Sequence, residues 1–502
     1  MISARRRLWL CMTLTILFCA SAAHAHVGNK DIYQTVSAGP YKLFVTVRTP
    51  LVIPGVASIE VRSSGSPVRG ITVTPLPLTG EASKHPPTPD AMKVSSSDSA
   101  YFTGSLWIMA SGSWQVRFNI DGTGGAATAS VPVPAVPTQI LRMQRPMAML
   151  LAALGLILVL GAVGIVIAAV RDARTLPGAT PEPARHRRGL IAGAAAFLFC
   201  AIAVYLAGKW WKVEAADYRA GMHRNSQLRT MLNSNRLDLS IGAPDPNSDS
   251  EWKIVDNSQL LADHGHLMHL YAIRWPAMDA VYHLHPVPDS KAGFTEALPS
   301  MPPGTYHLYA DVVFRNGFPE TETASLPLPQ GISGVPLGSE DASADPPPVS
   351  TTQLGPRFKL PDGYVMTWDK PASLTANTPY NFVFHLLDPH GTPASDMQPY
   401  LGMPGHAAFV KTDGTAFAHT HPDGSAAMPA VMLANESSGS SMDGMNAMDG
   451  MAESSTMKMS VEPLSSTVSF PYGFPSAGTY RIFIQMKHGT TVETGVFDAT
   501  VN

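Results

Sequence analysis

Histidines in the C-terminal half of the chain fall into two similar patterns. His269 is followed by a His-x-His-Pro segment at 283–286, and His406 is followed by another at 419–422. Neutral imidazoles are common ligands of copper, zinc and other transition metals, so either pattern could build a metal site. The alternative is that these histidines are structural, with their hydrogen bonds satisfied inside the fold. The recurrence of the pattern favours metal binding over a chance polar strip.

Hairpin geometry predicts that each pattern gathers its histidines on one face of a sheet. In the second pattern, the Asp-Gly pair at 413–414 favours a two-residue type I′ turn, which places His406 opposite His421. In the first pattern, a three-residue loop places His269 opposite His285. Directly opposed Cβ atoms lie ~4.5–5.5 Å apart, and side chains two residues apart share a face. The predicted metal ligands are therefore His269, His283, His285, His406, His419 and His421.

Further nitrogen and sulfur donors precede each pattern. Imidazole serves both Cu(I) and Cu(II), whereas thioether sulfur is soft and suits Cu(I). No spacing argument selects among these neighbours, so they remain additional candidate ligands: His264, His266, Met268 and Met403.

A methionine-rich insertion follows the second pattern. From Pro286 to Tyr306 there are 20 residues, whereas the equivalent stretch from Pro422 to Tyr480 has 58. The insertion, taken as 428–459, lacks a helical or strand period over its methionine-rich part and contains Met442, Met445, Met448, Met451, Met457 and Met459. Methionines in a solvated loop lose the usual hydrophobic benefit, so we expect these thioethers to capture Cu(I) and pass it to the histidines. The alternative is a tolerated low-complexity linker.

Composition predicts a mainly β fold of several domains. Only 15% of the 502 residues are charged, and there are 44 Pro and 41 Gly, which favours short strands and turns. The formal net charge of −3 gives no support for nucleic-acid binding. Period-two patterning and a repeated Gly-[Thr/Ser]-aromatic motif predict Ig-like or cupredoxin-like β-sandwiches. We expect these at 26–140, 250–330 and 355–502, with a linker at 331–354.

Apolar segments predict export and a membrane anchor. Residues 1–25 have the basic start, short apolar run and small-x-small end of a signal peptide. Two longer uncharged runs, 147–170 and 189–208, are long enough to cross a bilayer, although buried core helices are the alternative. The Arg-rich loop at 171–188 is expected in the cytoplasm, and the cleaved signal exports the first soluble part. Both soluble parts are therefore expected outside the inner membrane, in the periplasm. Residues 209–249 are expected to be a juxtamembrane segment containing a short helix, and a GxxxG pair at Gly189 and Gly193 could pack the helices.

The cysteines leave the expected exported domains without thiolates. Two of the three lie in the signal segment and the third, Cys200, lies in the second apolar run. Any soft ligand in the exported parts must therefore be methionine. His26 would start the mature chain and could chelate Cu(II) through its amine and imidazole, as in copper proteins with a histidine brace, with His85 as partner. The simpler interpretation is a residue beside the cleavage site.

A family resemblance agrees with this interpretation. The strings at 264–270, 283–286 and 400–406 resemble bacterial exported Ig-like proteins associated with copper and heavy metals, of the YtkA/FixH-like kind. The Met-Asp-Gly segment is similar to methionine-rich stretches of periplasmic copper-resistance proteins. The resemblance covers roughly 250–502 and implies a β-sandwich fold and copper handling, without an enzymatic activity.

Two functions are compatible with the sequence. The first is a membrane-anchored copper-binding protein that buffers, delivers or confers resistance to Cu(I) or Cu(II), with a copper transporter or a copper-dependent enzyme as partner. The second is a non-catalytic assembly protein whose sandwiches recruit a membrane partner. No phosphate-binding loop, nucleophile elbow or CxxC motif is present in the sequence, so no enzyme is expected.

Overall fold

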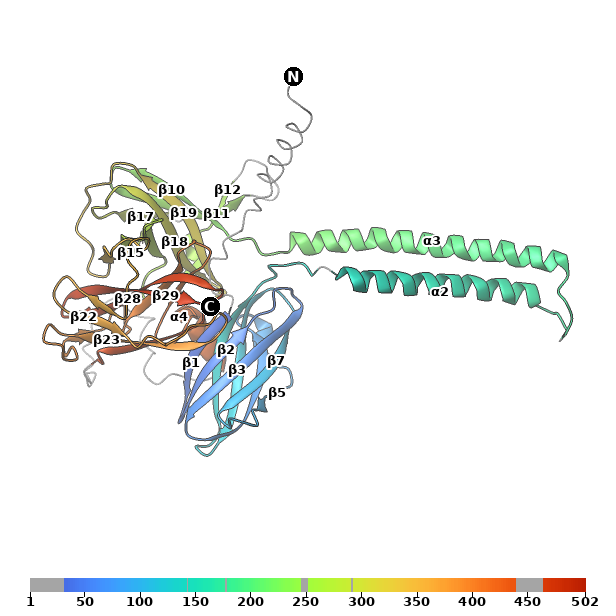
Figure 1. Ribbon diagram of the computed structural model, residues 1–502, viewed down its shortest axis with the longest axis horizontal. Coiled ribbons are helices and arrows are strands. Elements are labelled where there is room, and N and C mark those ends of the chain that lie inside the picture. Colours follow the sequence, from blue (N-terminus) through green and yellow to red (C-terminus); the bar gives the residue numbers. More distant parts are fainter. Residues whose placement is uncertain (1–30, 142, 177, 245–251, 290–291, 439–463) are drawn as a thin grey trace, which may run out of the picture. The chain divides into compact units, whose positions relative to one another are not determined.

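The computed structural model describes residues 31–141, 143–176, 178–244, 252–289, 292–438 and 464–502. The chain divides into two compact units, one at 136–223 and one that combines the regions on either side of it. The larger unit is built from antiparallel sheets, and the smaller one contains two long helices (Figure 1). The predicted fold class, mainly β with a helical pair between β-domains, is confirmed.

The first sandwich spans β1 to β9 and has its own apolar core. Its strands are β1 Asp31–Ala38, β2 Tyr41–Arg48, β3 Gly55–Gly65, β4 Val68–Pro77, β5 Asp90–Ala91, β6 Lys93–Val94, β7 Tyr101–Ile108, β8 Gly112–Gly122 and β9 Ala127–Ala135. The sheet orders are β1-β2-β3-β7-β6 and β5-β4-β8-β9. Alternate residues such as Leu43, Val45 and Val47 are fully buried, which is the period-two pattern expected for strands with one face on a core.

The second sandwich begins earlier than the sequence suggested. Its strands are β10 Gln227–Asn233, β11 Arg236–Pro244, β12 Trp252–Ile254, β13 Leu260–Leu261, β14 His269–Trp275, β15 Val281–Leu284, β16 Val287–Pro288, β17 Phe294–Ala297, β18 Gly304–Phe314, β19 Pro319–Leu328 and β20 Ala342–Ala344. The expected juxtamembrane segment 209–249 is therefore wrong as a separate element, since β10 and β11 belong to this sandwich. Alternating Leu237, Leu239 and Ile241 bury one face of β11, and a tight turn joins it to β10.

The third sandwich carries the remaining strands. They are β21 Arg357–Lys359, β22 Val365–Trp368, β23 Tyr380–Leu387, β24 Met397–Gln398, β25 His406–Lys411, β26 Phe417–Thr420, β27 Thr467–Tyr472, β28 Gly478–His488 and β29 Thr491–Val501. One sheet has the order β21-β22-β23-β27, and the other has β24-β28-β25-β26 with β29 beside β28. Aromatic residues, including Phe382, Phe409 and Phe470, fill the core between the sheets.

A shared strand start relates the three sandwiches. Strands β8, β18 and β28 each begin at a glycine with positive φ, at Gly112 (137°), Gly304 (156°) and Gly478 (139°). The aromatic residue two positions later donates a hydrogen bond to the carbonyl four residues before itself. The three bonds are Trp114 to Ala110, Tyr306 to Pro302 and Tyr480 to Ser476. The repeated Gly-[Thr/Ser]-aromatic motif is thus a structural repeat, and it anchors the same strand in each domain.

The expected linker and insertion both contain ordered elements. Strand β20 lies within 331–354 and pairs with β15, so this region is part of the second sandwich rather than a free linker. The insertion starts with a helix, α4 Met428–Ser438, whose Ala430 and Ala434 pack against Leu78 of the first sandwich. Met442, Met445, Met448 and Met451 lie outside the described residues.

Specific contacts join the sandwiches within the larger unit. Tyr309 of β18 stacks on Phe417 of β26, with ring centroids 4.2 Å apart. Arg481 of β28 donates to Asp498 of β29 and also to the carbonyl of Met278 in the second sandwich. The first and third sandwiches are joined at Tyr33, Thr35 and the segment 423–425, where Thr35 N donates to Asp423 O at 2.6 Å and Tyr33 exchanges hydrogen bonds with Ser425. These contacts bring the histidine strands of the second and third sandwiches together.

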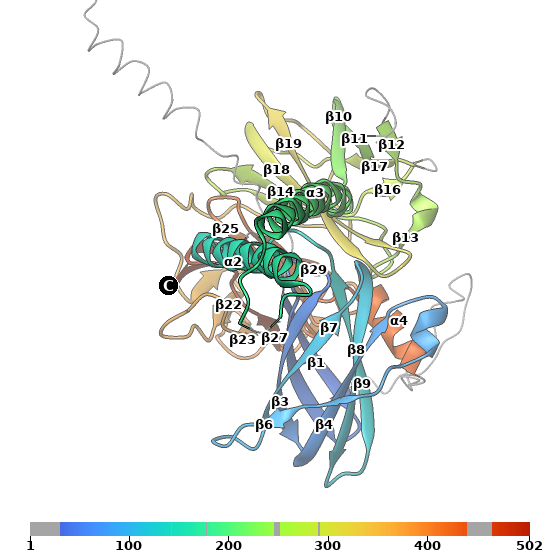
Figure 2. The same ribbon diagram turned by 90° about the vertical axis from the view of Figure 1, so that its right-hand side faces the viewer.

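The smaller unit is a pair of helices suited to a membrane. Helices α2 Arg145–Asp172 and α3 Pro183–Ala220 lie side by side (Figures 1 and 2) and are long and apolar enough to cross a bilayer. Both extend beyond the apolar runs expected from the sequence. Gly189 and Gly193 are buried against Ile167 of α2, so the GxxxG pair does allow close approach of the helices. Their exposed apolar surfaces are unlike those of buried core helices.

Candidate metal centre

The two histidine hairpins have the predicted registers. In β14–β15, Leu270 pairs with Leu284 and Tyr271 with His283. In β25–β26, Ala407 pairs with Thr420 and Ala408 with His419. Both registers agree with the sequence argument, so the histidines of each hairpin share one face.

The second hairpin reaches this register through a different turn. Its strands close at the hydrogen bond from Lys411 N to Ala416 O, and only Gly414 of the central pair has positive φ (76°). A type I′ turn requires positive φ at both positions, so that prediction was wrong. The Asp413 carboxylate accepts from the Thr415 N–H, which stabilises a four-residue loop instead. Because the loop adds one residue to each side, the pairing is unchanged.

Eight histidines from the second and third sandwiches meet at the interface between them. Their imidazoles are in mutual contact: the ring centroids of His264 and His406 are 5.2 Å apart, and those of His269 and His419 are 5.4 Å apart. Within this cluster, two groups have ligand atoms within 4.8 Å of one another. We call His269, His283 and His285 the second-domain trio, and His264, His406 and His421 the interdomain trio.

Outer hydrogen bonds fix the tautomers of the second-domain trio. His269 Nε2 lies 3.0 Å from the carbonyl oxygen of Asp263, His283 Nδ1 lies 2.8 Å from Gln485 Oε1, and His285 Nδ1 lies 3.0 Å from Asp341 Oδ1. All three partners are acceptors, so each of these nitrogens carries the proton. The opposite nitrogen of each ring therefore keeps its lone pair, as in metal-binding histidines held by carbonyl or carboxylate partners.

The lone pairs of the second-domain trio converge. His269 Nδ1 and His283 Nε2 lie 3.3 Å apart, and His285 Nε2 has no hydrogen-bond partner among the described residues. Two unprotonated nitrogens at this distance repel each other unless a cation lies between them. Two imidazoles bound at about 2.0–2.1 Å to one tetrahedral ion have their nitrogens about 3.3 Å apart. The residues present therefore fit a transition-metal ion.

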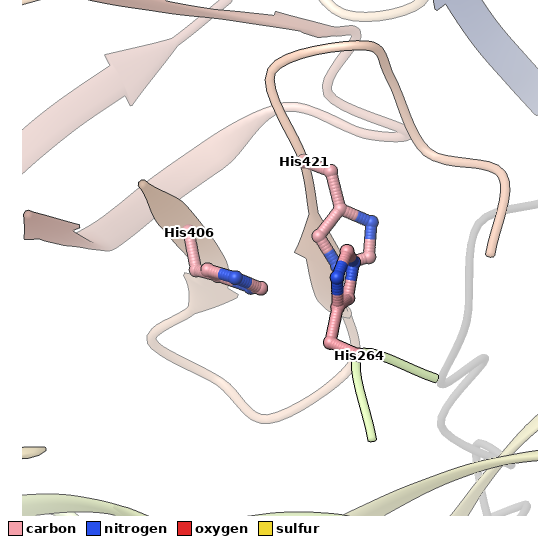
Figure 3. Close-up of side chains that lie close together, drawn as sticks. All are labelled: His264, His406 and His421. Carbon is pink, nitrogen blue, oxygen red and sulfur yellow. The ribbon is translucent and has the colours of Figure 1, made fainter. Parts of the chain in front are cut away.

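The interdomain trio takes ligands from both sandwiches. Figure 3 shows His406 and His421 from the third sandwich and His264 from the second, with their rings close together. The Nε2 atoms of all three are buried and have no hydrogen-bond partner in the described part of the chain. A backbone hydrogen bond from the His264 ring to Leu401 raises the pKa of His264, and one from the His421 ring to Ala426 raises the pKa of His421. Both backbone partners are therefore carbonyl groups, and each accepts from the Nδ1 atom of its histidine. Three free Nε2 atoms thus face a common space.

His419 lies behind this trio rather than within it. Its Nδ1 is 3.2 Å from Asp311 Oδ2, and its Nε2 is 3.2 Å from His406 Nδ1. Because the carboxylate only accepts, Nδ1 of His419 carries a proton. The contact between His419 Nε2 and His406 Nδ1 fixes the orientation of the His406 ring, whose Nε2 has no hydrogen-bond partner among the described residues. The sequence placed His419 with His406 and His421, whereas the structure groups His264 with them and gives His419 an orienting position.

Burial keeps the two trios neutral. Desolvation lowers the pKa of His264 to about 4 and that of His285 below its ordinary value of 6.5. It also lowers the pKa values of the other ligands well below 6.5, and neighbouring histidines add to the effect: His269, His283, His406 and His421. Unprotonated imidazoles at neutral pH are the form that binds metals.

A strained turn presents histidines to both trios. Asp263 and His266 exchange backbone hydrogen bonds across His264 and Gly265, with φ values of 52° and 90° at the two central positions. Positive φ is uncommon for a histidine and often occurs at functional sites. His264 joins the interdomain trio. The ring centroid of His266 lies 4.3 Å from that of His285, and its Nε2 contacts Glu340. Sequence reasoning gave His264 no geometric role, although the Gly265 beside it is a turn signal.

Other candidate ligands lie in different surroundings. Met268 is fully buried in the apolar core of the second sandwich, on the opposite face of the strand from His269. Met403 is buried beside His421, where both residues line a small cavity. His85 is exposed and contacts Glu81, and His26 lies outside the described residues. The acceptors Asp311, Asp341 and Gln485 were missed because they lie far in sequence from the histidines that they contact, and Asp263 was missed because it acts through its backbone carbonyl.

A third group of potential ligands lies at another edge of the third sandwich. Asp362, His488 and Glu493 have ligand atoms within 4.8 Å of one another. His488 Nε2 is 2.8 Å from Asp362 and Nδ1 is 3.2 Å from Asp396. The contacts of His488 with the two carboxylates account for this group without a metal.

A comparison with known families finds a match within the third sandwich. A family model for a domain of unknown function, DUF8832, matches residues 359–502. The match includes His406, His419 and His421 and covers less than half of the chain. No curated protein matches the chain significantly.

Three solved structures are remotely similar to this chain. An engineered protein is 16% identical, over 18% of this chain and 20% of that chain, with a TM-score of 0.15. A D1–D4 ectodomain fragment of ICAM-5 is 8% identical, over 92% and 77% of the two chains, with a TM-score of 0.15. Alpha-2-macroglobulin from Escherichia coli is 9% identical, over 92% and 31%, with a TM-score of 0.18. The chain thus spans a minor part of the first and third of these proteins.

Proposed function

We propose that this chain is a membrane-anchored copper-binding protein that holds one ion at each histidine trio. The observation that carries the proposal is the contact between His269 Nδ1 and His283 Nε2 at 3.3 Å, because outer hydrogen bonds leave both nitrogens unprotonated. A bound ion would supply the positive charge that these facing lone pairs require. The role is binding and delivery rather than catalysis, with a copper transporter or a copper-dependent enzyme in the same membrane as partner.

Donor chemistry favours copper over harder metals. Both trios consist of neutral nitrogens, and imidazole suits copper and zinc better than magnesium or calcium. The chain also carries six methionines between 442 and 459, and no cysteine lies outside the signal segment and the second apolar run. Thioethers select Cu(I), which agrees with the resemblance to copper-associated exported proteins. We propose that this segment captures Cu(I) for the histidines.

We further propose that both β-rich regions lie in the periplasm and that the loop between α2 and α3 is cytoplasmic. The segment 171–188 has five arginines, which favours the cytoplasmic side. A cysteine introduced at Ala179, in a chain whose Cys200 is replaced by alanine, should be unreactive towards an impermeant maleimide in intact cells. Labelling from outside would contradict this orientation.

Metal titration of the full chain in detergent tests the proposed function. The metal-free protein should bind one Cu(II) for each trio. The double variant His283→Ala/His285→Ala should lose the ion of the second-domain trio, and His406→Ala/His421→Ala should lose the ion of the interdomain trio. Each loss follows from removing two of three nitrogen ligands. Metal analysis after dialysis gives the stoichiometry.

A matched control removes two exposed histidines, His85→Ala/His390→Ala, and should bind as the wild type does. The competing role, an assembly protein with incidental histidines, makes a different prediction. In that case, a variant that combines both double substitutions would bind as much copper as the wild type, and the proposal would be wrong.

A further inference from the structure

A small cavity adjoins the interdomain trio on the side of helix α4. It has a volume of about 70 Å³ and is lined by Gln34, Met403, His421, Asp423, Ala426, Met428 and Val431. Two methionines and one histidine thus line the same space. His421 also belongs to the interdomain trio, so the cavity and the trio share this residue.

A repeated turn explains why Met403 lies beside His421. The turn from Tyr400 to Met403 has the same bridge and the same positive φ values, at Leu401 (51°) and Gly402 (77°), as the turn from 263 to 266. Each turn ends three residues before the first histidine of its hairpin. Met403 therefore occupies the position that His266 has in the second sandwich. There, His266 contacts His285. The two trios thus have equivalent neighbours with different chemistry, an imidazole at one and a thioether at the other.

Met428 reaches the cavity from the first turn of helix α4. Its backbone N–H donates to the Asp263 carboxylate, which ties the start of this helix to the turn that carries His264. Asp263 Oδ1 also lies 3.5 Å from His264 Nε2. The start of α4 is therefore held directly against the interdomain trio. The methionine-rich segment follows α4 in the sequence, from Met442.

We propose that Met403, Met428 and His421 form a loading site for Cu(I), through which the ion passes to the interdomain trio. Two thioethers and a neutral imidazole are soft or borderline ligands that select the reduced ion. The transfer is ligand exchange without change of oxidation state: His421 keeps the ion while the two sulfurs are replaced by His264 and His406. This inference rests on the proposed function of the trio.

The test compares Cu(I) transfer into full-length protein in detergent. The probe is the Cu(I) complex of bathocuproine disulfonate, whose absorbance falls as copper leaves it. Met403→Leu/Met428→Leu keeps side-chain volume but removes both sulfurs, and should slow loading of the trio about tenfold or more, as loss of supporting ligands does in other metal sites. Cu(II) stoichiometry should stay at the wild-type value, because thioethers are poor ligands for Cu(II).

The matched control is Met397→Leu, a buried methionine of the third-sandwich core outside the cavity, which should load at the wild-type rate. Single variants at Met403 and Met428 should each give intermediate rates. Loading of the double variant at the wild-type rate would overturn the loading site while leaving copper binding by the trios intact. Failure of the wild type to bind copper at all would overturn both proposals.

Discussion

Replacing His264 with alanine should remove copper from the interdomain trio and leave the second-domain trio occupied. His264 contributes one of three converging Nε2 atoms, and neither His406 nor His421 can replace it from the third sandwich alone. We expect the affinity at this position to fall by more than about 100-fold, which exceeds the effect of losing an outer partner. Competition with a chelator of known affinity measures the change.

The matched comparison is His419→Ala. His419 orients His406 through the 3.2 Å contact but offers no ligand atom to the trio, so we expect a loss of about 10–100-fold, typical of an outer hydrogen-bond partner. A larger loss for His419→Ala than for His264→Ala would reverse these assignments. It would restore the sequence-based grouping of His406, His419 and His421.

The hairpin registers could be predicted because they depend only on local geometry. Side chains alternate along a strand, so the spacing between His406 and the His-x-His-Pro segment fixes which residues share a face. The register was unaffected by the wrong turn type, because a four-residue loop and a two-residue turn about the same centre give the same pairing. The same alternation places Met268 on the core side of His269, and the sequence already contained that signal.

The interdomain trio could not be predicted in this way. His264 reaches the third sandwich only because two sandwiches pack together through contacts such as Tyr309 on Phe417. Such contacts depend on the shapes of two folded surfaces, and no period in the sequence reports them. The outer partners Asp311 and Gln485 were missed for the same reason, since each lies on a different strand from the histidine that it holds.

The domain boundary failed after the second apolar run. Helix α3 continues to Ala220, and strand β10 begins at Gln227. The segment 209–249 was interpreted as a juxtamembrane segment with a short helix, although the alternation of Leu237, Leu239 and Ile241 has period two. The linker at 331–354 was misassigned because its Pro-rich composition hides the three-residue strand β20.

Copper binding by the second-domain trio should change little between pH 7 and pH 5. Metal binding requires unprotonated imidazoles, and burial lowers the pKa of His269 and His283 well below 6.5 and also lowers that of His285. Protons then compete weakly with the ion over this range. For an exposed histidine with a pKa near 6.5, the protonated form exceeds the neutral form about 30-fold at pH 5. A site made of three such histidines would lose roughly 10⁴-fold in copper affinity between pH 7 and pH 5. We expect the trio to lose less than about tenfold.

The two trios provide internal controls for this measurement. His264→Ala leaves only the second-domain trio, and His285→Ala leaves only the interdomain trio. Asp263 lies beside the latter, and burial raises the pKa of its carboxyl to about 7, so it gains a proton as the pH falls from 7 to 5. Loss of this negative charge beside His264 weakens cation binding there, so the affinity of the interdomain trio should fall more steeply, by up to about 100-fold.

Chelator competition at each pH gives the affinity of both trios as a function of pH. A 10⁴-fold loss at the second-domain trio would mean that its histidines titrate like exposed ones, and that the buried, preorganised site does not exist in solution.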